Sequence, residues 1–300
     1  MKSFLIAIVM LGLTVASSAQ AGADSLSHWT LGGNTSLTFN QVSLRYWAAG
    51  GKNSMSGTFL FKTFANYKSE NMTWDNTLDI GYGMTKYSHE DLQKSEDKIY
   101  LSSQYGYNAA RQKLFYSALF DIKTQFASGY KYTSADTTRI SDFFAPAYIN
   151  LSLGLLYKPN DVFMAYLSPL TSRLTIVTDT VLSTTYGLDA GKKLRAEYGA
   201  TAKIEIKKDD LVKNVDFYLR SLFFSNLVED PQYIDVDCET GFNFRVNEFL
   251  TALLKFNLLF DNDTKYIETI VDDDGNAVKR ERGARLQCKQ MFGFGLAYKW

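Results

Sequence analysis

Hydrophobic and polar residues alternate along the segment 71–87. One set of alternate positions is apolar or aromatic apart from one asparagine, and it consists of Met72, Trp74, Asn76, Leu78, Ile80, Tyr82 and Met84. The other set is small or polar, and it consists of Thr73, Asp75, Thr77, Asp79, Gly81, Gly83 and Thr85. Because the side chains of a β-strand point alternately to its two faces, this pattern predicts a strand about twice as long as the usual ~5–6 residues.

The same alternation recurs along the rest of the chain and predicts about twelve strands. They cover 30–44, 53–67, 71–86, 98–109, 113–126, 146–158, 161–177, 194–207, 214–225, 234–246, 249–261 and 285–300. Pro169 interrupts the segment 161–177, and the parity of this segment is unclear. It is either one strand or two short strands around a kink, so totals of ten or fourteen strands stay open.

The predicted connections alternate between long loops and tight turns. The long ones are 46–52, 87–97, 127–145, 178–193, 226–233 and 262–284. The tight ones are 68–70, 110–112, 159–160, 208–213 and 247–248. Outer-membrane barrels carry long loops on their outer rim and short turns on the periplasmic rim, whereas a soluble sandwich has no reason to separate loop lengths in this way. The connections therefore favour an all-β, transmembrane antiparallel barrel with its apolar faces toward lipid.

Charged residues gather on the second face of the predicted strands. In a membrane barrel this face lines the lumen. The pore-lining candidates are Lys62, Asp75, Asp79, Asp121, Lys123, Arg195, Glu197, Lys203, Glu205, Arg220, Glu239, Arg245, Lys255 and Lys289, and Asp216 and Asp237 share their face. The two signs are nearly balanced, which favours pairing across the lumen over a selectivity ring of one sign.

The N-terminal residues have the pattern of a secretory signal. Lys2 precedes an apolar run over 4–15, and small residues follow up to Ala21. We expect a signal peptide over 1–21, cleaved after Ala21 or at Ala19, and a barrel domain over 22–300. The apolar run is shorter than the ~20 residues that a spanning helix needs, which disfavours an N-terminal anchor. No later run is long enough either, so a barrel is the fold that could cross a membrane.

The overall composition agrees with long strands and argues against a nucleic-acid partner. The 32 basic and 32 acidic residues cancel, so no electrostatic attraction to nucleic acid is expected. Tyr and Phe are abundant, with 19 and 21 copies, while the 4 prolines are few enough not to break the ladders. The expected surroundings are outer-membrane lipid.

Four phrases of the sequence resemble a known family. They are G-G-N-T-S-L-T-F-N-Q-V-S-L-R-Y-W-A-A-G-G-K-N-S at 32–54, W-D-N-T-L-D-I-G-Y-G at 74–83, I-S-D-F-F-A-P-A-Y at 140–148 and L-S-P-L-T-S-R-L-T-I-V at 167–177. Together they resemble a family of bacterial outer-membrane β-barrels that is filed as domain of unknown function 3078. The resemblance implies an outer-membrane barrel and supplies no substrate, reaction or functional residue.

The C-terminal tripeptide Y-K-W resembles the aromatic end that the barrel-assembly machinery recognises in outer-membrane proteins. In this sequence the aromatic residues are Tyr298 and Trp300, whereas phenylalanine is more usual at the last position. The resemblance implies that these two residues act as an assembly signal and that the assembly machinery is a partner.

Few residues offer catalytic chemistry. The only histidines are His28, in the leader to the first strand, and His89, beside Glu90 and Asp91 in a predicted loop. Adjacent residues in a loop rarely provide the positioned base that a hydrolase needs, so we expect no enzyme. The run 272–276 fails the register of a calcium loop, and its Asp-Gly pair favours a hairpin tip. No metal or cofactor is expected.

The two cysteines invite a disulfide, because an exported protein enters an oxidising compartment. Cys238 and Cys288 fall on two predicted strands that have another strand between them. With strands spaced ~4.8 Å apart, the residues lie roughly 10 Å from each other, beyond the ~7 Å that a disulfide bridges. We therefore expect two unpaired thiols that point toward lipid.

Two functions follow from this pattern. The first is a transport or pore protein for small hydrophilic solutes, whose path the charged face lines. The alternative is a closed structural barrel whose extracellular loops bind a partner or a ligand. The loop 127–145 carries Phe143 and Phe144 with Pro146 just after it, and it either folds inward to narrow the opening or stays exposed outside.

Overall fold

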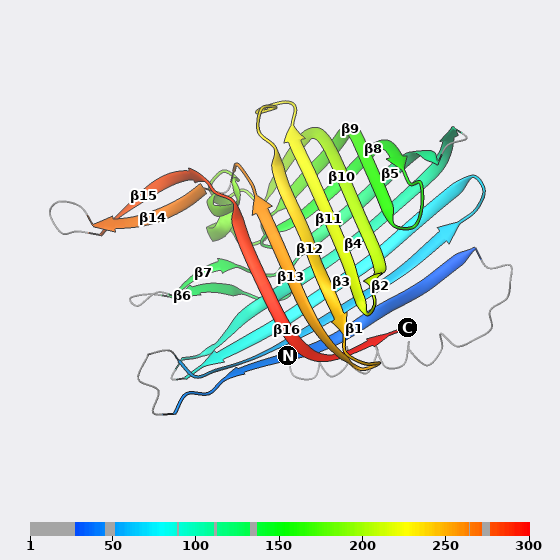
Figure 1. Cartoon of the computed structure of the whole chain (residues 1–300). Coiled ribbons are helices and arrows are strands. Elements are labelled where there is room, and N and C mark those ends of the chain that lie inside the picture. The colour runs from blue at the N-terminus through cyan, green and yellow to red at the C-terminus, as the bar shows by residue number, and fades with distance from the viewer. Residues whose placement is uncertain are drawn as a thin grey trace.

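Twelve antiparallel strands close into a single barrel. The computed structural model describes residues 28–45, 52–88, 90–110, 113–132, 137–263, 265–271 and 277–300. The barrel strands are β1 (Trp29–Val42), β2 (Ser54–Lys68), β3 (Met72–Tyr87), β4 (Leu92–Ala110), β5 (Leu114–Thr124), β8 (Ala147–Tyr157), β9 (Phe163–Ile176), β10 (Leu194–Val212), β11 (Val215–Asn226), β12 (Asp235–Arg245), β13 (Leu250–Phe260) and β16 (Gln287–Lys299). Neighbours in sequence are neighbours in the wall, and β16 returns to pair with β1 (Figure 1). The predicted fold class is confirmed.

Two further hairpins extend the long-loop end of the barrel. β6 (Gly129–Tyr132) pairs with β7 (Thr137–Ser141), and β14 (Lys265–Val271) pairs with β15 (Ala277–Ala284). Both hairpins project from the same end of the barrel, on the left in Figure 1. The described part of the chain contains no helix with the length and apolar character needed to cross a bilayer.

The segment with unclear parity forms one strand, β9, with a bulge at its proline. Up to the bulge the buried, inward side chains are at even positions, such as Tyr166 and Ser168. Beyond it they are at odd positions, such as Thr171 and Thr175. Pro169 has no partner in the register with β8 or in that with β10, since both ladders shift there. A bulge adds one residue to a strand and so reverses the alternation, which explains the mixed pattern.

The polarity of the barrel is inverted relative to a soluble protein. Leucines of β8 such as Leu151 and Leu153 point outward, with about half of each side chain exposed, at 49% and 57%. Charged residues such as Asp121, Lys203 and Lys255 point inward and are at most 3% exposed. An outer wall of this kind is stable when lipid covers it, because exposing the leucine side chains to water would cost free energy.

Aromatic side chains form a row on the outer wall near the tight-turn end. Trp29, Tyr67, Trp74 and Tyr105 are successive partners across β1, β2, β3 and β4. The Trp29 ring lies 5.3 Å from Tyr67 and 5.7 Å from Trp74, centre to centre. Amphipathic rings gather at the level of lipid headgroups, so this row is placed to mark one edge of the apolar band.

The C-terminal residues close the barrel against β1. Six residue pairs join β1 to β16, from Asn34↔Lys299 to Phe39↔Phe294. Beyond them Trp300 exchanges two backbone hydrogen bonds with Gly33, at 3.1 and 3.2 Å. The Trp300 ring stacks on Tyr298 with 6.1 Å between ring centres, and it covers the position where Gly33 lacks a side chain. The two residues that resemble an assembly signal therefore lie at the closure of the barrel.

Replacing Gly33 by alanine is expected to lower the free energy of unfolding by about 1–3 kcal/mol. An added Cβ would lie 2.5 Å from the Lys62 carbonyl oxygen and 2.5 Å from the Trp300 ring, so the closure must shift. Gly283→Ala is the matched control, because a Cβ at Gly283 meets nothing within 4 Å. Denaturant titration of the refolded barrel in detergent measures both changes. Equal effects at the two positions would contradict the assigned packing.

Candidate functional site: the barrel lumen

Five charged side chains form a girdle across the middle of the lumen: Asp79, Lys98, Arg220, Glu239 and Lys255. The Lys98 ammonium donates to Asp79 at 2.6 Å and to Glu239 at 2.9 Å. Glu239 also lies 3.3 Å from Lys255 and 3.5 Å from Arg220. Its carboxylate thus serves three cations. A buried ion pair needs this kind of multiple compensation, because each charge has lost its hydration.

The girdle joins opposite walls of the barrel. Lys98 is on β4 and Glu239 is on β12, and five strands separate β4 from β12 on either side of the ring. A hydrogen bond of 2.9 Å between side chains of these strands therefore spans the interior. The Lys98 and Glu239 side chains are only 8% and 7% exposed, so water has little access to them. The lumen is closed at this level.

Aromatic and apolar side chains complete the closure. The Arg220 guanidinium lies 4.0 Å from the centre of the Tyr100 ring, and the Tyr100 hydroxyl donates to Asp121 at 2.6 Å. Beside them, Leu119, Leu156, Met164 and Tyr166 form a buried apolar cluster. The second carboxylate oxygen of Asp121 is buried without a hydrogen-bond partner among the described residues. Charges and hydrophobic groups thus fill the same cross-section.

Further ion pairs link strands above and below the girdle. They are Lys123 with Asp237, Lys289 with Glu96, Arg173 with Asp235 and Lys158 with Asp75. The Arg173 guanidinium also lies 3.7 Å from the centre of the Phe224 ring. Most of these pairs join strands that are not neighbours in the wall. They brace the lumen as well as lining it.

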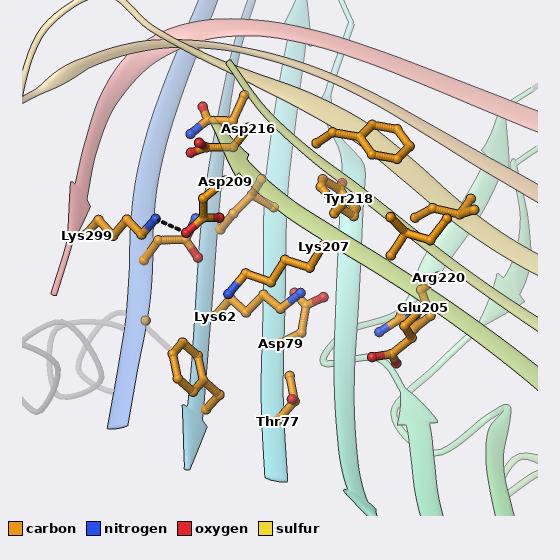
Figure 2. Close-up of a pocket in the computed structure, with 18 of the residues that line it drawn as sticks. Lys62, Thr77, Asp79, Glu205, Lys207, Asp209, Asp216, Tyr218, Arg220 and Lys299 are labelled. Atoms are coloured by element: carbon orange, nitrogen blue, oxygen red, sulfur yellow. Dashed lines mark hydrogen bonds and ion pairs between the residues drawn. The ribbon is translucent and has the colours of Figure 1, made fainter. Parts of the chain in front are cut away.

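A cavity of about 940 Å³ lies in the lumen on the tight-turn side of the girdle, and we call it the vestibule (Figure 2). Its deep wall includes Asp79, Glu239 and Lys255 of the girdle. Its outer lining includes rim residues such as Asp161, whose side chain is 83% exposed. The vestibule is therefore open to solvent at the tight-turn end and closed at its inner end.

The opposite mouth carries a small cap. The 3-10 helix η1 (Thr180–Tyr186) packs Leu182 against Ala145, Val177 and Leu188 in a buried apolar cluster. Burial raises the pKa of the Tyr186 phenol to about 12, so it stays protonated near neutral pH and donates to the Ile140 carbonyl oxygen at 2.7 Å.

Arg195 connects this cap to the barrel. It donates to the Gly187 carbonyl oxygen at 3.1 Å and pairs with Asp263 at 2.7 Å and with Glu197 at 2.9 Å. Since Asp263 follows β13 and Arg195 belongs to β10, the arginine ties two parts of the rim together.

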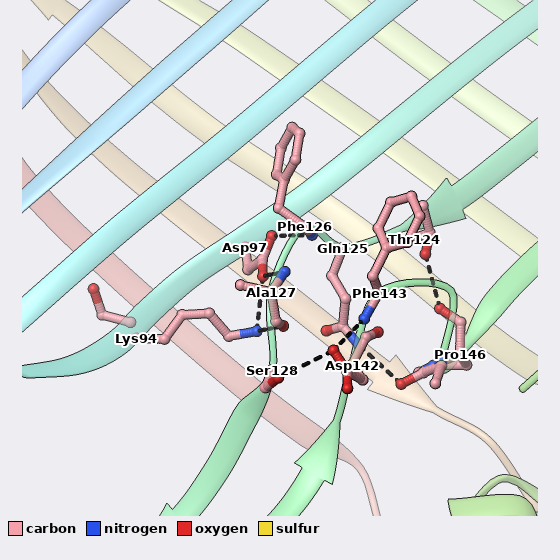
Figure 3. A network of polar contacts seen from close by, with 12 residues as sticks. Lys94, Asp97, Thr124, Gln125, Phe126, Ala127, Ser128, Asp142, Phe143 and Pro146 are labelled. Atoms are coloured by element: carbon pink, nitrogen blue, oxygen red, sulfur yellow. Dashed lines mark hydrogen bonds and ion pairs between the residues drawn. The ribbon is translucent and has the colours of Figure 1, made fainter. Parts of the chain in front are cut away.

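The β6–β7 hairpin is pinned at its base and exposed beyond it (Figure 3). Asp97 of β4 accepts hydrogen bonds from the backbone of Phe126 at 2.7 Å and Ala127 at 3.0 Å, and from Lys94 at 2.7 Å. Phe143 is 52% exposed. Of the two alternatives for the loop 127–145, its described residues support an exposed hairpin over a segment folded into the lumen.

The structure places the pore-lining candidates on the inner face. Asp79, Arg220, Glu239 and Lys255 belong to the girdle, and Lys62, Asp75, Lys203, Glu205 and Arg245 line the vestibule outside it. Asp121 lies under Tyr100, while Lys123, Arg195, Glu197 and Lys289 pair on the long-loop side. These residues lie in a packed network and do not form the wall of an open channel.

Sequence reasoning missed several members of this network. Glu96 falls in the predicted loop 87–97 and Lys98 stands at the first position of the predicted strand 98–109, whereas β4 begins at Leu92. Lys207 stands at the last position of its predicted strand, and β10 continues to Val212. The signal was present at 96–98, where Glu96 and Lys98 have the same parity as Tyr100 and the other inward residues of β4.

Other candidate chemistry is limited. His89 and the run 272–276 lie outside the described residues. Glu90 pairs with Lys52 and accepts a hydrogen bond from Gln93 at 3.0 Å. Both cysteines are free thiols, as predicted, and both pair in register with Leu258 of the intervening strand. No group of three or more His, Cys, Asp or Glu in the described residues is arranged to hold a metal ion.

Residues 39–130 match the family model described as a protein of unknown function, DUF3078. The resemblance predicted from the sequence is confirmed. The DUF3078 match runs from β1 into β6 and includes the girdle residues Asp79 and Lys98, as well as Lys62. The two later phrases, at 140–148 and 167–177, lie beyond the matched residues.

Solved outer-membrane barrels are similar in fold. The translocator domain of the autotransporter NalP from Neisseria meningitidis is 12% identical, with a TM-score of 0.38, and the similarity covers 100% of this chain and 98% of that one. The COG4313 outer membrane channel from Pseudomonas putida F1 is 8% identical, with a TM-score of 0.37 and coverages of 91% and 96%. The P. putida toluene transporter TodX is 10% identical, with a TM-score of 0.31 and coverages of 91% and 79%. Similarity at this level concerns the fold alone. No curated protein matches the sequence.

Proposed function

We propose that the protein is exported with removal of residues 1–21, resides in the outer membrane, and is a gated transport protein for a small hydrophilic solute. The vestibule carries this proposal. It is large enough for a small molecule, it is open to solvent at one end, and charged and hydrogen-bonding groups line it. The inverted polarity of the wall supports the membrane location. The proposal includes no catalytic role, and the barrel-assembly machinery is its expected assembly partner.

The girdle requires that transport be gated. Because Lys98 and Glu239 bond across the lumen, a solute in the vestibule passes only when these contacts break. A girdle made of ion pairs suits this role, since water that enters the lumen can solvate the separated charges. An unmodified barrel would then be closed most of the time and would open in discrete events.

A closed barrel that binds a partner with its surface hairpins is the second candidate. The observation that favours it is the burial of the girdle together with the projection of two hairpins from one end (Figure 1). In this case the ion pairs brace the barrel permanently.

Single-channel recording of the refolded protein in a planar bilayer separates the two candidates. Gated transport predicts rare, discrete openings in the unmodified protein and an increased open probability in Asp79→Asn, which removes one of the two partners of Lys98. Asn for Asp keeps the shape of the side chain, and a mobility shift on heating checks folding. A silent bilayer for both folded proteins would contradict transport and would favour the closed barrel.

A further inference from the structure

Two lysines of the vestibule have no carboxylate partner among the described residues. Lys62 of β2 and Lys207 of β10 form no ion pair with any described residue, although most other charged residues of the vestibule are paired. Lys62 stands directly opposite Asp79 in the register of β2 and β3. The Asp79 carboxylate, however, is bonded to Lys98. Asp79, the carboxylate nearest to Lys62 in the strand register, is therefore already paired with Lys98.

The two lysines reach toward each other from opposite walls. Five strands separate β2 from β10 on either side of the ring. The Lys207 ammonium lies 4.9 Å from the centre of the Phe64 ring, and Phe64 is two residues from Lys62 on the same face of β2. The Lys62 ammonium lies 5.6 Å from the centre of the Tyr218 ring, and Tyr218 is the direct partner of Lys207 across β10 and β11.

In this reciprocal arrangement each lysine extends across the vestibule, so that its ammonium lies beside an aromatic ring of the opposite wall. Figure 2 shows both side chains among the residues that line the cavity. Aromatic faces attract cations, but more weakly than a carboxylate or phosphate does, so each ammonium keeps donors for a stronger acceptor. The vestibule also has one acidic residue without an ion pair among the described residues, Glu248, which is exposed at the tight-turn rim.

We propose that Lys62 and Lys207 form a binding site for a dianionic oxyanion, specifically a phosphoryl group, in the vestibule. Two ammonium groups match the two negative charges of a phosphoryl dianion, and each has donors free to bind its oxygens. The rings of Phe64 and Tyr218 provide an apolar surface beside it for the rest of an organic phosphate. The inference names a solute class for the proposed transport function and rests on it for physiological meaning.

Isothermal titration calorimetry tests the site by measuring the affinity of the refolded protein, in zwitterionic detergent, for inorganic phosphate. We expect saturable binding that weakens about tenfold or more in Lys62→Met and in Lys207→Met, since each variant removes one charge-assisted contact. Methionine keeps the length and flexibility of lysine without its charge.

Lys158→Met is the matched control, because Lys158 lines the same cavity and is already paired with Asp75 at 2.5 Å. It should change the affinity less than about twofold, because the Lys158 ammonium is already bound to Asp75 and is not one of the two proposed ligand contacts.

Two results would overturn the inference. One is the absence of binding to the folded, unmodified protein. The other is equal weakening in all three variants, which would mean that the ligand senses only the general charge of the cavity. Titration with phenyl phosphate then separates the sources of the group: tighter binding than inorganic phosphate indicates an organic phosphate, and equal binding indicates the free ion. Phosphate binding without conductance would support the site and contradict transport. Conductance without phosphate binding would support transport and contradict the site.

Discussion

Replacing Glu239 by glutamine is expected to lower the free energy of unfolding of the barrel by about 3–5 kcal/mol. The substitution keeps the shape of the side chain and removes the negative charge that Lys98, Arg220 and Lys255 share. All three cations stay buried after the change, and an uncompensated buried charge is far more costly than the loss of a pair. Denaturant titration of the refolded protein in vesicles measures the change.

Two further variants make this expectation specific. Asp161→Asn removes a carboxylate from the exposed pair with Lys68 and should change the stability by less than about 1 kcal/mol. The double variant Lys255→Met with Glu239→Gln removes a cation together with its anion and should recover part of the loss. A loss in Glu239→Gln no larger than that in Asp161→Asn would show that the girdle is hydrated and not closed.

Replacing Leu153 by arginine is expected to lower the free energy of unfolding by about 2–4 kcal/mol in a bilayer. Leu153 lies near the middle of β8, faces outward and is 57% exposed, so in a membrane its side chain meets lipid. An arginine at this position either loses its hydration or distorts the bilayer so that water reaches its charge, and both cost free energy. Unfolding by denaturant in lipid vesicles measures the loss.

Leu227→Arg is the control for that experiment. Leu227 is 51% exposed and follows β11 at the long-loop end, outside the barrel strands. The same chemical change there should cost less than about 1 kcal/mol, because the penalty for a charge falls toward zero near the ends of the strands. Similar losses at the two positions would mean that the outer wall does not face lipid.

The alternation of apolar and polar residues was sufficient to predict the barrel. All twelve predicted barrel strands are present, and most of their boundaries agree within a few residues. The exceptions are the long extensions of β4 and β10, where charged residues such as Glu96 and Asp209 continue the inward face beyond the apolar band. A strand outside that band keeps its ladder but loses its apolar face, so the hydrophobic pattern ends before the strand does.

The sequence was sufficient to predict which charged residues face the lumen, but not how they pair across it. Parity assigned the charged residues to the inner face, since all inward positions of a strand share one parity. It could not show that Lys98 meets Glu239, because the diameter of the ring and the relative heights of β4 and β12 come from the register of every strand between them. The sequence therefore left both an open path and a braced lumen possible, although the near-balance of the two signs favoured pairing across the lumen. The register decides for a closed girdle in the described structure.

The salt bridge between Lys98 and Glu239 also makes the stiffness of the barrel depend on direction. It ties two walls that face each other across one diameter, whereas strands a quarter of the way round, such as β1 and β9, have no direct part in it. In a membrane, lateral tension would pull the wall outward, and along this diameter the pull would act directly on the Lys98–Glu239 salt bridge. The stiffness of the barrel is therefore expected to differ with direction in the plane of its cross-section, with the stiff axis along the line from β4 to β12.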